Sequence, residues 1–293
     1  MSNVHAASST HRWQTAVPVI SDREFELFQT FIHRETGIYL SASKKTLLVA
    51  RLARRLRELG LTSFEAYYRR VVGRNSGDER IHLIDCICTN ETHFFREPRQ
   101  FEYIKHWIIP EWMAQAAAGR RSREIRVWSA ACSTGEEPYS IAMLLLASLP
   151  PAAGWRIELL ATDLSTRVIE QGRKGVWSVD EAEEIPTEYF TAFMMKGTRS
   201  NQGKMKASQQ LRAAICWLRV NLNDEGYAVT GPFDMIFCRN VLIYFDEPCK
   251  TRVIKRLLAH IARSGYLFLG HAENARSVNI GLRSVIPTVY CIP

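Results

Sequence analysis

The fold of this chain is decided by residues 125 to 142, which read IRVWSAACSTGEEPYSIA. A β-type run from Ile125 to Ala130 is followed by small residues that end at Gly135, and then by an apolar segment of helix length. A strand, a tight turn and a helix in this order are typical of a doubly wound α/β sheet, in which the turn lets a ligand approach the backbone closely. We therefore expect a ligand site at this turn.

Four more β-type runs follow along the chain, separated by segments long enough for helices: 157–161, 216–220, 234–238 and 266–269. This alternation predicts a mostly parallel, Rossmann-like sheet with helices on both faces. One stretch, at about 190–211, breaks the alternation because Gly197, Asn201 and Gly203 punctuate short polar runs. We interpret it as a small antiparallel β insertion, with a long surface loop as the alternative.

The region before the sheet is predicted to be helical throughout. Ser21 and Glu24 have the spacing of a capping box, and Gly37 marks the end of the helix that they begin. A basic amphipathic helix is expected over residues 44–59, and Thr62 with Glu65 is expected to begin a third helix that runs to Val72. A fourth helix is predicted at 78–88.

The two parts are joined by a predicted linker helix. Pro98 suits the first turn of that helix, and Pro110 should kink or restart it before a basic stretch at 120–123. The expected organisation is a disordered tail, a helical domain, a linker helix with a basic linker, and an α/β domain, at residues 1–18, 19–97, 98–123 and 124–293 respectively.

Composition narrows the class of protein. The 293 residues include 46% hydrophobic side chains, enough for a sizeable core, and the net charge of +8 favours an anionic partner. The longest apolar run is far shorter than the about 20 residues that span a bilayer, and the polar N-terminus does not resemble a signal peptide, so we expect a cytoplasmic protein. The seven cysteines include no CxxC pair and the eight histidines form no cluster, so no metal site is expected.

The turn at Gly135 favours a ligand without phosphate groups. It lacks the glycine spacing and the lysine of a phosphate-binding loop, and Glu136 and Glu137 would repel a pyrophosphate at the start of the helix. Two carboxylates suit a cationic ligand instead. S-adenosyl-L-methionine, with its ammonium and sulfonium groups, fits that description.

Polar residues follow three further strands at the same edge of the predicted sheet. Asp163, at the end of the second strand, can accept hydrogen bonds from both hydroxyls of a ribose, although Asp163 or Ser165 can also simply cap the next helix. Asn221 follows the third strand. Arg239 and Asn240 follow the fourth, where an arginine is costly to bury unless a ligand or another group pairs with it.

Five segments together resemble one family, the CheR chemotaxis receptor methyltransferases. These are TNETHFFRE at 89–97, WSAACSTGEEPYS at 128–140, TDLS at 162–165, FCRNVLIYF at 237–245 and FLGHAEN at 268–274. The resemblance runs in order from about residue 20 to the C-terminus. It implies a helical N-terminal domain, a class I methyltransferase sheet with a small β-subdomain, and methyl transfer from S-adenosylmethionine to receptor glutamates, with S-adenosyl-L-homocysteine as the product.

The resemblance also implies roles for individual residues. Tyr244 is similar to a tyrosine near the transferring methyl group, and Arg96 is implied as a second catalytic residue. Some family members dock a receptor C-terminal tether on the β-subdomain, where this chain has Arg199 to Gln202. The implied partner is the cytoplasmic helical domain of chemoreceptors in membrane arrays, bound by a monomer. The implied cofactor contacts are Asn90, Thr92, Arg96, Glu136 or Glu137, Asp163, Asn221, Leu222, Arg239 and Asn240.

Physical chemistry adds two expectations about the substrate. A glutamate side chain has a pKa of about 4.3, so at neutral pH it is already a nucleophile and no general base is required. The basic helix would attract an acidic receptor surface through Arg51, Arg54, Arg55 and Arg57, each exposed pair contributing at most about 1 kcal/mol. An ordinary solvated helix face is the alternative interpretation of these arginines.

Two other functions share part of this pattern. A nucleic-acid methyltransferase would also be basic and would share the cofactor fold. An enzyme that methylates base amino groups usually carries an Asn/Asp-Pro-Pro-aromatic signature after the fourth strand, where this chain has Arg239-Asn240-Val241-Leu242. A cytosine C5 enzyme needs a Pro-Cys nucleophile, and here Phe237 precedes Cys238. A non-catalytic adaptor that kept the fold would not need the cofactor residues. Binding of S-adenosylmethionine separates an adaptor from an enzyme.

Overall fold

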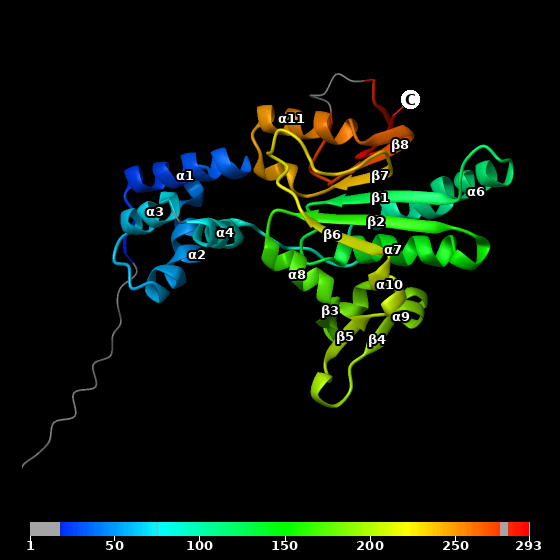
Figure 1. Ribbon diagram of the computed structural model, residues 1–293, viewed down its shortest axis with the longest axis horizontal. Helices are drawn as coiled ribbons and strands as arrows, with labels where there is room; N and C mark the ends of the chain where they lie inside the picture. Colours follow the sequence, from blue (N-terminus) through cyan, green and yellow to red (C-terminus); the bar gives the residue numbers. More distant parts are fainter. Residues whose placement is uncertain (1–17, 75, 276–280, 293) are drawn as a thin grey trace, which may run out of the picture.

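A seven-stranded sheet forms the centre of the larger domain (Figure 1). The computed structural model describes residues 18–74, 76–275 and 281–292, so the expected tail at 1–18 lies outside the described residues except for Pro18. The strand order is β6-β2-β1-β7-β8-β10-β9. The strands are β1 (Glu124–Ala130), β2 (Arg156–Asp163), β6 (Ile215–Arg219), β7 (Phe233–Cys238), β8 (Ile261–Leu269), β9 (Arg283–Ile286) and β10 (Val289–Cys291).

Five neighbouring strands, from β6 to β8, are parallel, as the sequence predicted. Two strands of this sheet that the sequence did not predict, β9 and β10, add an antiparallel edge. Strand order reverses between β1 and β7, because the chain passes from β1 to β2 and β6 on one side and from β7 to β8 on the other. Ligands of open α/β sheets bind at such a switch point, at the carboxyl ends of the strands.

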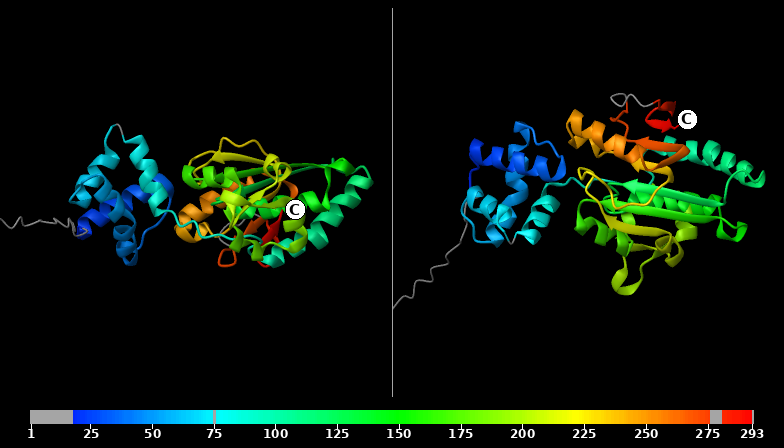
Figure 2. Two further views of the ribbon diagram at one scale, coloured as in Figure 1. Left: turned by 90° about the horizontal axis from the view of Figure 1, so that it is seen from below. Right: turned by 45° about the horizontal axis from the view of Figure 1, so that its top comes forward.

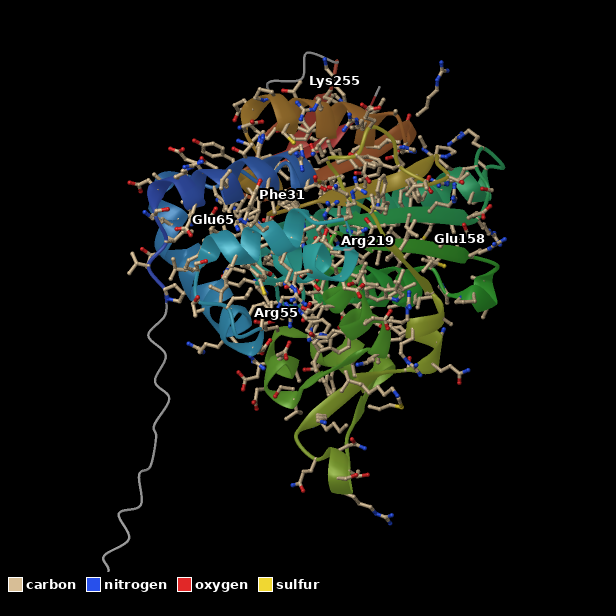
Figure 3. All side chains as sticks on the ribbon, turned by 60° about the vertical axis from the view of Figure 1, so that its left-hand side comes forward. Phe31, Arg55, Glu65, Glu158, Arg219 and Lys255 are labelled. Atoms are coloured by element: carbon tan, nitrogen blue, oxygen red, sulfur yellow. The ribbon has the colours of Figure 1, made fainter. Side chains whose placement is uncertain are left out.

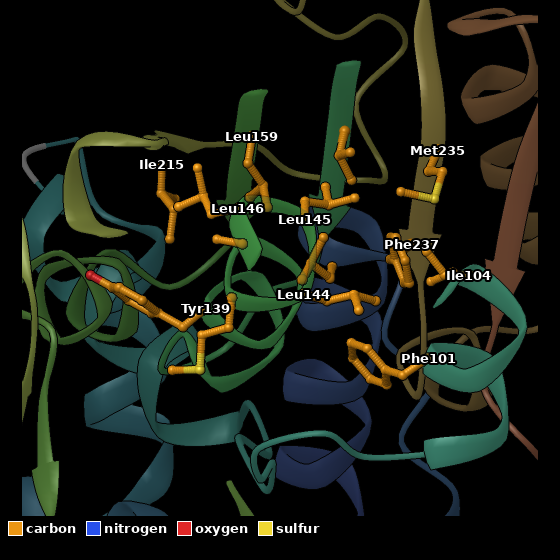
Figure 4. Packing of buried hydrophobic residues seen from close by; sticks show 14 of the residues in the cluster. Phe101, Ile104, Tyr139, Leu144, Leu145, Leu146, Leu159, Ile215, Met235 and Phe237 are labelled. Atoms are coloured by element: carbon orange, nitrogen blue, oxygen red, sulfur yellow. The ribbon is translucent and has the colours of Figure 1, made fainter. Parts of the chain in front are cut away.

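Successive side chains of each strand face opposite layers of the domain. Val127 packs in the core beneath α7 (Glu136–Ser148), whereas its neighbour Trp128 packs beneath α11 (Glu247–Leu258). Figure 4 shows the first of these cores, where Leu144, Leu145 and Leu146 gather against the strands together with Phe101 and Ile104. Helices therefore cover both faces of the sheet, and the predicted fold class is confirmed.

The helical domain consists of four helices that pack around Phe28, Leu52, Leu56 and Tyr67. The capping box of Ser21 and Glu24 is present, and Gly37 ends the first helix with a φ of 75°. The third helix is capped by Ser63, whose side chain accepts the Ala66 N–H, and not by Thr62 as expected. The helices are α1 (Asp22–Thr36), α2 (Lys45–Glu58), α3 (Phe64–Val72) and α4 (Gly77–Ile87).

The predicted linker helix belongs to the sheet domain by its packing. It consists of α5 (Pro98–Tyr103), a π-helical turn at Ile104–Ile108, and α6 (Ile109–Ala117), which has Pro110 in its first turn. A helical restart at this proline was expected, since proline fits the first turn of a helix. Buried side chains along this helix, such as Ile108 and Trp112, join the core of the sheet.

The insertion is a three-stranded antiparallel sheet and not a long surface loop. Its order is β3-β5-β4, with β3 at Val176–Ser178, β4 at Met194–Lys196 and β5 at Lys204–Ala207. The expected boundary at residue 190 was therefore too late, because β3 pairs with β5 across more than twenty intervening residues and such a short strand has no periodicity of its own. We call residues 176–207 the β-subdomain.

The two domains lie side by side and contact each other through the end of α1 (Figure 2). The last turn of a helix leaves carbonyl groups without partners inside the helix. Asn221 donates to the Glu35 carbonyl (2.7 Å) and Asn223 donates to the Arg34 carbonyl (3.1 Å). The Tyr39 N–H donates to the Tyr244 carbonyl (2.8 Å). The sheet domain thus caps the first helix of its neighbour.

Candidate active site

The carboxyl ends of β1 and β2 point toward the helical domain (Figure 1). A cavity lined by residues that follow β1, β2, β6 and β7 lies at this edge of the sheet. Its volume is about 1190 Å³, including space open to solvent. The helical domain closes it with residues from α1, α2 and α4 and from the segments that follow α1 and α4, among them Leu40, Leu47 and Arg51. The sheet domain supplies Ala131 to Ser133, Asp163, Val220 to Leu222, and Arg239 to Val241.

The turn after β1 approaches its neighbours so closely that only small residues fit. Ala131 and Ser133 have positive φ angles of 66° and 51°, and Gly135 has a φ of 107°. A Cβ atom added to Gly135 would lie 3.0 Å from the Trp217 ring and 3.1 Å from the Gly172 Cα. This backbone path therefore requires a glycine at position 135.

Asp163 holds the turn to the next strand. Its Oδ2 accepts the Ser133 N–H (2.9 Å) and its Oδ1 accepts the Ser165 N–H (2.9 Å). An ionised carboxylate has about four acceptor positions, so Asp163 keeps acceptor capacity for a ligand in the cavity. Of the two caps that the sequence left open, the structure assigns the cap of α8 (Thr166–Lys174) to Ser165, which accepts the Val168 N–H.

Glu137 and Arg239 form a buried ion pair at the base of the cavity. The Arg239 Nε donates to Glu137 Oε2 (2.6 Å), and Ser129 donates to Glu137 Oε1 (2.6 Å). The guanidinium also donates through Nη1 to the Arg96 carbonyl (2.7 Å) and to Gln100 Oε1 (3.1 Å). Arg239 therefore joins β7, α7 and the segment around Arg96, and burial of its charge is compensated by these partners.

The two adjacent glutamates have different surroundings. Glu137 lines the cavity, whereas Glu136 accepts hydrogen bonds from Thr134 and from the Trp177 indole (2.9 Å) of the β-subdomain and does not line it. Burial raises the pKa of Glu136. Successive helix residues point about 100° apart, so the two side chains cannot face the same cavity.

Glu273 organises the fourth strand end and was missed by the sequence analysis. Its carboxylate accepts backbone N–H groups of Gly270 (2.6 Å), Asn240 (2.9 Å), Leu242 (2.7 Å) and Ile243 (3.3 Å). This fixes the loop that leads to Tyr244, with Asn240 at a φ of 58°. Within the FLGHAEN segment, an acid three residues after the glycine that follows β8 was the available signal.

Comparisons with known proteins agree with this geometry. Residues 23–88 match the family description "CheR methyltransferase, all-alpha domain", and residues 90–291 match "CheR methyltransferase, SAM binding domain". The chain belongs to the CheR methyltransferase family. It is an S-adenosylmethionine-dependent methyltransferase, and the recognition made from the five sequence segments is confirmed.

Relatives extend over most of the chain. A "Chemotaxis protein methyltransferase 2" of Pseudomonas aeruginosa is 37% identical over 94% of this chain and 98% of its own length. The "Chemotaxis protein methyltransferase" of Escherichia coli is 38% identical over 87% of this chain and 85% of its own length. That of Salmonella typhimurium is 37% identical over the same fractions.

The residues present fit S-adenosylmethionine as the CheR cofactor. Asp163 lines the cavity and offers further acceptor positions to a ribose. Glu137 also lines the cavity, but its charge is paired with Arg239. Asn221 lines the same cavity, but its amide donates to Glu35 and its Oδ1 accepts the Asn223 N–H. Its side chain therefore also joins the two domains. The predicted contacts that line the cavity are Asn90, Thr92, Arg96, Glu137, Asp163, Asn221, Leu222, Arg239 and Asn240, together with Tyr244.

The arginines of α2 occupy different positions. Arg51 lines the cavity and donates to the Ile87 carbonyl and to Thr89 (2.9 Å), so it supports the connection between the domains. Arg55 (Figure 3) pairs with the buried Glu79 (2.7 Å), which leaves it little freedom to bind a partner. Arg54 is 85% exposed and pairs with Glu58, and Arg57 is exposed. Lys44, which the sequence analysis did not single out as a site residue, is exposed at the cavity.

Cofactor affinity should depend on pH through Asp163. Burial raises the pKa of this carboxyl, although the N–H groups of Ser165 and Ser133 oppose the shift. Protonation of the carboxylate removes acceptor positions for the ligand. We therefore expect the Kd for S-adenosylhomocysteine to rise as the pH falls through the pKa of Asp163, which lies above the ordinary aspartate value of about 3.9. The free energy of unfolding should depend on pH in the opposite direction from cofactor binding. A carboxyl whose pKa is raised in the folded state stabilises the fold at low pH, and this stability is lost as the pH rises through the raised pKa.

Calorimetric titrations at a series of pH values below neutrality check this expectation. The Asp163→Asn variant, which cannot titrate at this position, should show a flatter profile. Equal slopes for the variant and the unmodified chain would assign the effect to another group, such as Glu273, whose pKa is also raised by burial.

No group of three or more His, Cys, Asp or Glu side chains within residues 18–74, 76–275 and 281–292 is arranged to hold a metal ion. In the same part of the chain, none of the helices has the length and apolar character needed to cross a membrane.

Proposed function

We propose that this enzyme transfers the methyl group of S-adenosylmethionine to glutamate side chains of chemoreceptors and forms methyl esters. The observation that carries the proposal is the position of the cavity, which has the cofactor residues on one wall and Tyr244 and the basic helix α2 at the boundary between the domains. The curated relatives are named chemotaxis protein methyltransferases, which supports a receptor substrate in the cytoplasm.

The chemistry requires positioning more than proton transfer. The cofactor supplies an electrophilic methyl group on a sulfonium. A receptor glutamate is ionised at neutral pH, so the chain has to exclude water and orient the carboxylate. Tyr244 can do this with its hydroxyl, because its backbone is fixed by hydrogen bonds to Tyr39 and Val241. Arg96 lines the same cavity and adds a positive charge near an incoming carboxylate.

A labelling experiment tests the proposal. The enzyme is incubated with methyl-labelled S-adenosylmethionine and membranes that contain chemoreceptors, and the labelled protein is treated with alkali. Glutamyl esters should release the label as methanol. Label that resists alkali would indicate methylation of nitrogen or nucleic acid and would contradict the proposal.

The basic face of α2 supports docking of an acidic receptor helix. Lys44, Leu47 and Arg51 line the cavity, and Arg54 continues the same face of the helix one turn further. Arg57 points about 120° away from Arg51, at roughly 100° per residue, and Arg55 is held by Glu79. Lys44 and Arg54 are therefore the cations that we expect to meet the receptor.

Reversing these charges should slow methylation. With Lys44→Glu and Arg54→Glu combined, the initial rate at low salt should fall roughly tenfold or more, because rim charges act mainly on the encounter rate. The difference should shrink as salt is added. Arg69→Glu on α3, an exposed arginine of the same domain, is the matched control. Equal rates for the double variant and this control would refute docking at α2.

The β-subdomain leaves the edges of β3 and β4 unpaired by its own sheet. An extended peptide can add to such an edge by backbone hydrogen bonds. We therefore propose that a C-terminal tether of the receptor binds at an edge of the β-subdomain, near the loop Arg199 to Gln202 that joins β4 to β5.

A further inference from the structure

The segment from Asn90 to Arg96 supplies four cavity residues, Glu91 among them, but has no helix or strand of its own. Asn90, Thr92 and Arg96 all line the cavity. The backbone that carries them includes Phe95 at a φ of 50° and ends at Glu97 at a φ of 63°. Positive φ angles are unfavourable for such side chains and persist only where surrounding contacts enforce them. The contacts of this segment therefore determine the position of its cavity residues.

The sheet domain holds this segment through Ser133, Ser140 and Arg239. The β-subdomain provides a second set of contacts, at Phe94 and Phe95. The Phe94 ring lies edge-on to the Trp177 ring (5.1 Å between centroids, 73°), and the Phe95 ring stacks on Tyr189 (5.3 Å, 6°). The Phe94 N–H donates to Glu184 Oε2 (3.0 Å). Phe94 is 1% exposed, so its ring is enclosed on all sides. These partners come from residues 177–189, about ninety positions further along the chain.

Trp177 also contacts α7, the helix that carries the cavity residue Glu137. Its indole N–H donates to Glu136 Oε1 (2.9 Å), in the first turn of α7, and its ring lies edge-on to Tyr139 of the same helix (4.8 Å). Glu136 in turn accepts the hydroxyl of Thr134 in the turn after β1. One side chain of the β-subdomain thus touches both the segment that carries Arg96 and the helix that carries Glu137.

We propose that Trp177 is a positioning residue for the cofactor site. The β-subdomain then has a second role besides any contact with a receptor, because it holds the Asn90 to Arg96 segment and the start of α7 in register across the cavity. The proposal concerns cofactor binding, which belongs to the established methyltransferase activity, and it does not depend on the identity of the methyl acceptor.

The first test is Trp177→Phe, which keeps an aromatic ring against Phe94 and removes the N–H that Glu136 accepts. We expect the Kd for S-adenosylhomocysteine, measured by calorimetry, to rise roughly 3- to 10-fold, in the range of other residues that act through a neighbour. Trp155→Phe is the matched control, since Trp155 is equally buried but precedes β2 at the end of the sheet away from the cavity. We expect Trp155→Phe to lower the Tm by a similar amount and to bind S-adenosylhomocysteine with the Kd of the unmodified enzyme.

A second pair of variants keeps the proposal testable if Trp177→Phe does not fold. Glu184 is 41% exposed, so its replacement should be tolerated. Glu184→Ala removes the acceptor of the Phe94 N–H and should raise the Kd several-fold, whereas Glu184→Gln retains an acceptor and should restore it. An unchanged Kd in Glu184→Ala, or an equal rise in Glu184→Gln, would overturn the proposal. The proposal would also be overturned if the Kd of Trp177→Phe were within twofold of the Kd of Trp155→Phe.

Discussion

Replacing Arg239 with alanine is expected to cost about 3–5 kcal/mol of the free energy of unfolding, because the change leaves the buried carboxylate of Glu137 without its charged partner. The side chain of Arg239 is only 2% exposed and that of Glu137 10%. The variant also loses the hydrogen bonds to the Arg96 carbonyl and to Gln100. Urea unfolding followed by circular dichroism measures the loss, and binding of S-adenosylhomocysteine should be lost with it.

Two further variants separate the ion pair from general effects of losing an arginine. Arg219→Ala (Figure 3) removes an exposed arginine that donates a hydrogen bond to the Leu164 carbonyl, and it should cost less than about 1 kcal/mol. The double variant Arg239→Met with Glu137→Gln removes both charges, so it should unfold at a higher urea concentration than Arg239→Ala. If Arg239→Ala and Arg219→Ala unfold at the same urea concentration, the ion pair does not stabilise the fold as argued.

Asp163→Asn should weaken cofactor binding on the order of 100-fold, with a smaller effect on stability. Hydrogen bonds to a charged acceptor contribute about 1.5–3 kcal/mol each, and the substitution removes the charge. The amide group adds a second problem, because its NH₂ must face the N–H of either Ser133 or Ser165, both of which need an acceptor. The turn after β1 should therefore shift in the variant.

Calorimetric titration with S-adenosylhomocysteine measures this effect. Asp224→Asn, an exposed aspartate in the loop after β6, is the matched control and should bind normally. A Kd for Asp163→Asn equal to that of Asp224→Asn would remove Asp163 from the cofactor site, whereas a lost thermal transition would show that its role is mainly structural.

Local patterns predicted most elements of the fold. The capping box at Ser21, the glycine after α1 and the run of small residues before Gly135 each act over a few neighbouring residues, so the sequence identifies them directly. The boundaries of β1, β2, β6 and β7 were expected to within two residues. The strand β3 was not found, since three residues that pair with a distant strand have no local periodicity.

The candidate site divides in the same way. The strand ends were recognisable because parallel strands bring their carboxyl ends to one edge, and Asp163, Arg239 and Asn240 follow such strands. The sequence could not distinguish Glu136 from Glu137, nor find that Glu79 holds Arg55. Both outcomes depend on which way a side chain points and on a partner many residues away.

The sequence by itself thus determined the order of the elements and the edge of the sheet at which polar residues collect. Only the tertiary structure decided which of those polar groups face the cavity and which are held by other side chains, as Glu273 and Trp177 show. The physical reason is the range of the interactions. Backbone propensity and helix capping act within one turn or one strand, so they can be predicted from neighbouring residues. A buried charge or N–H group finds its partner wherever the folded chain brings a suitable group within about 3 Å, and that partner can be far away in the sequence.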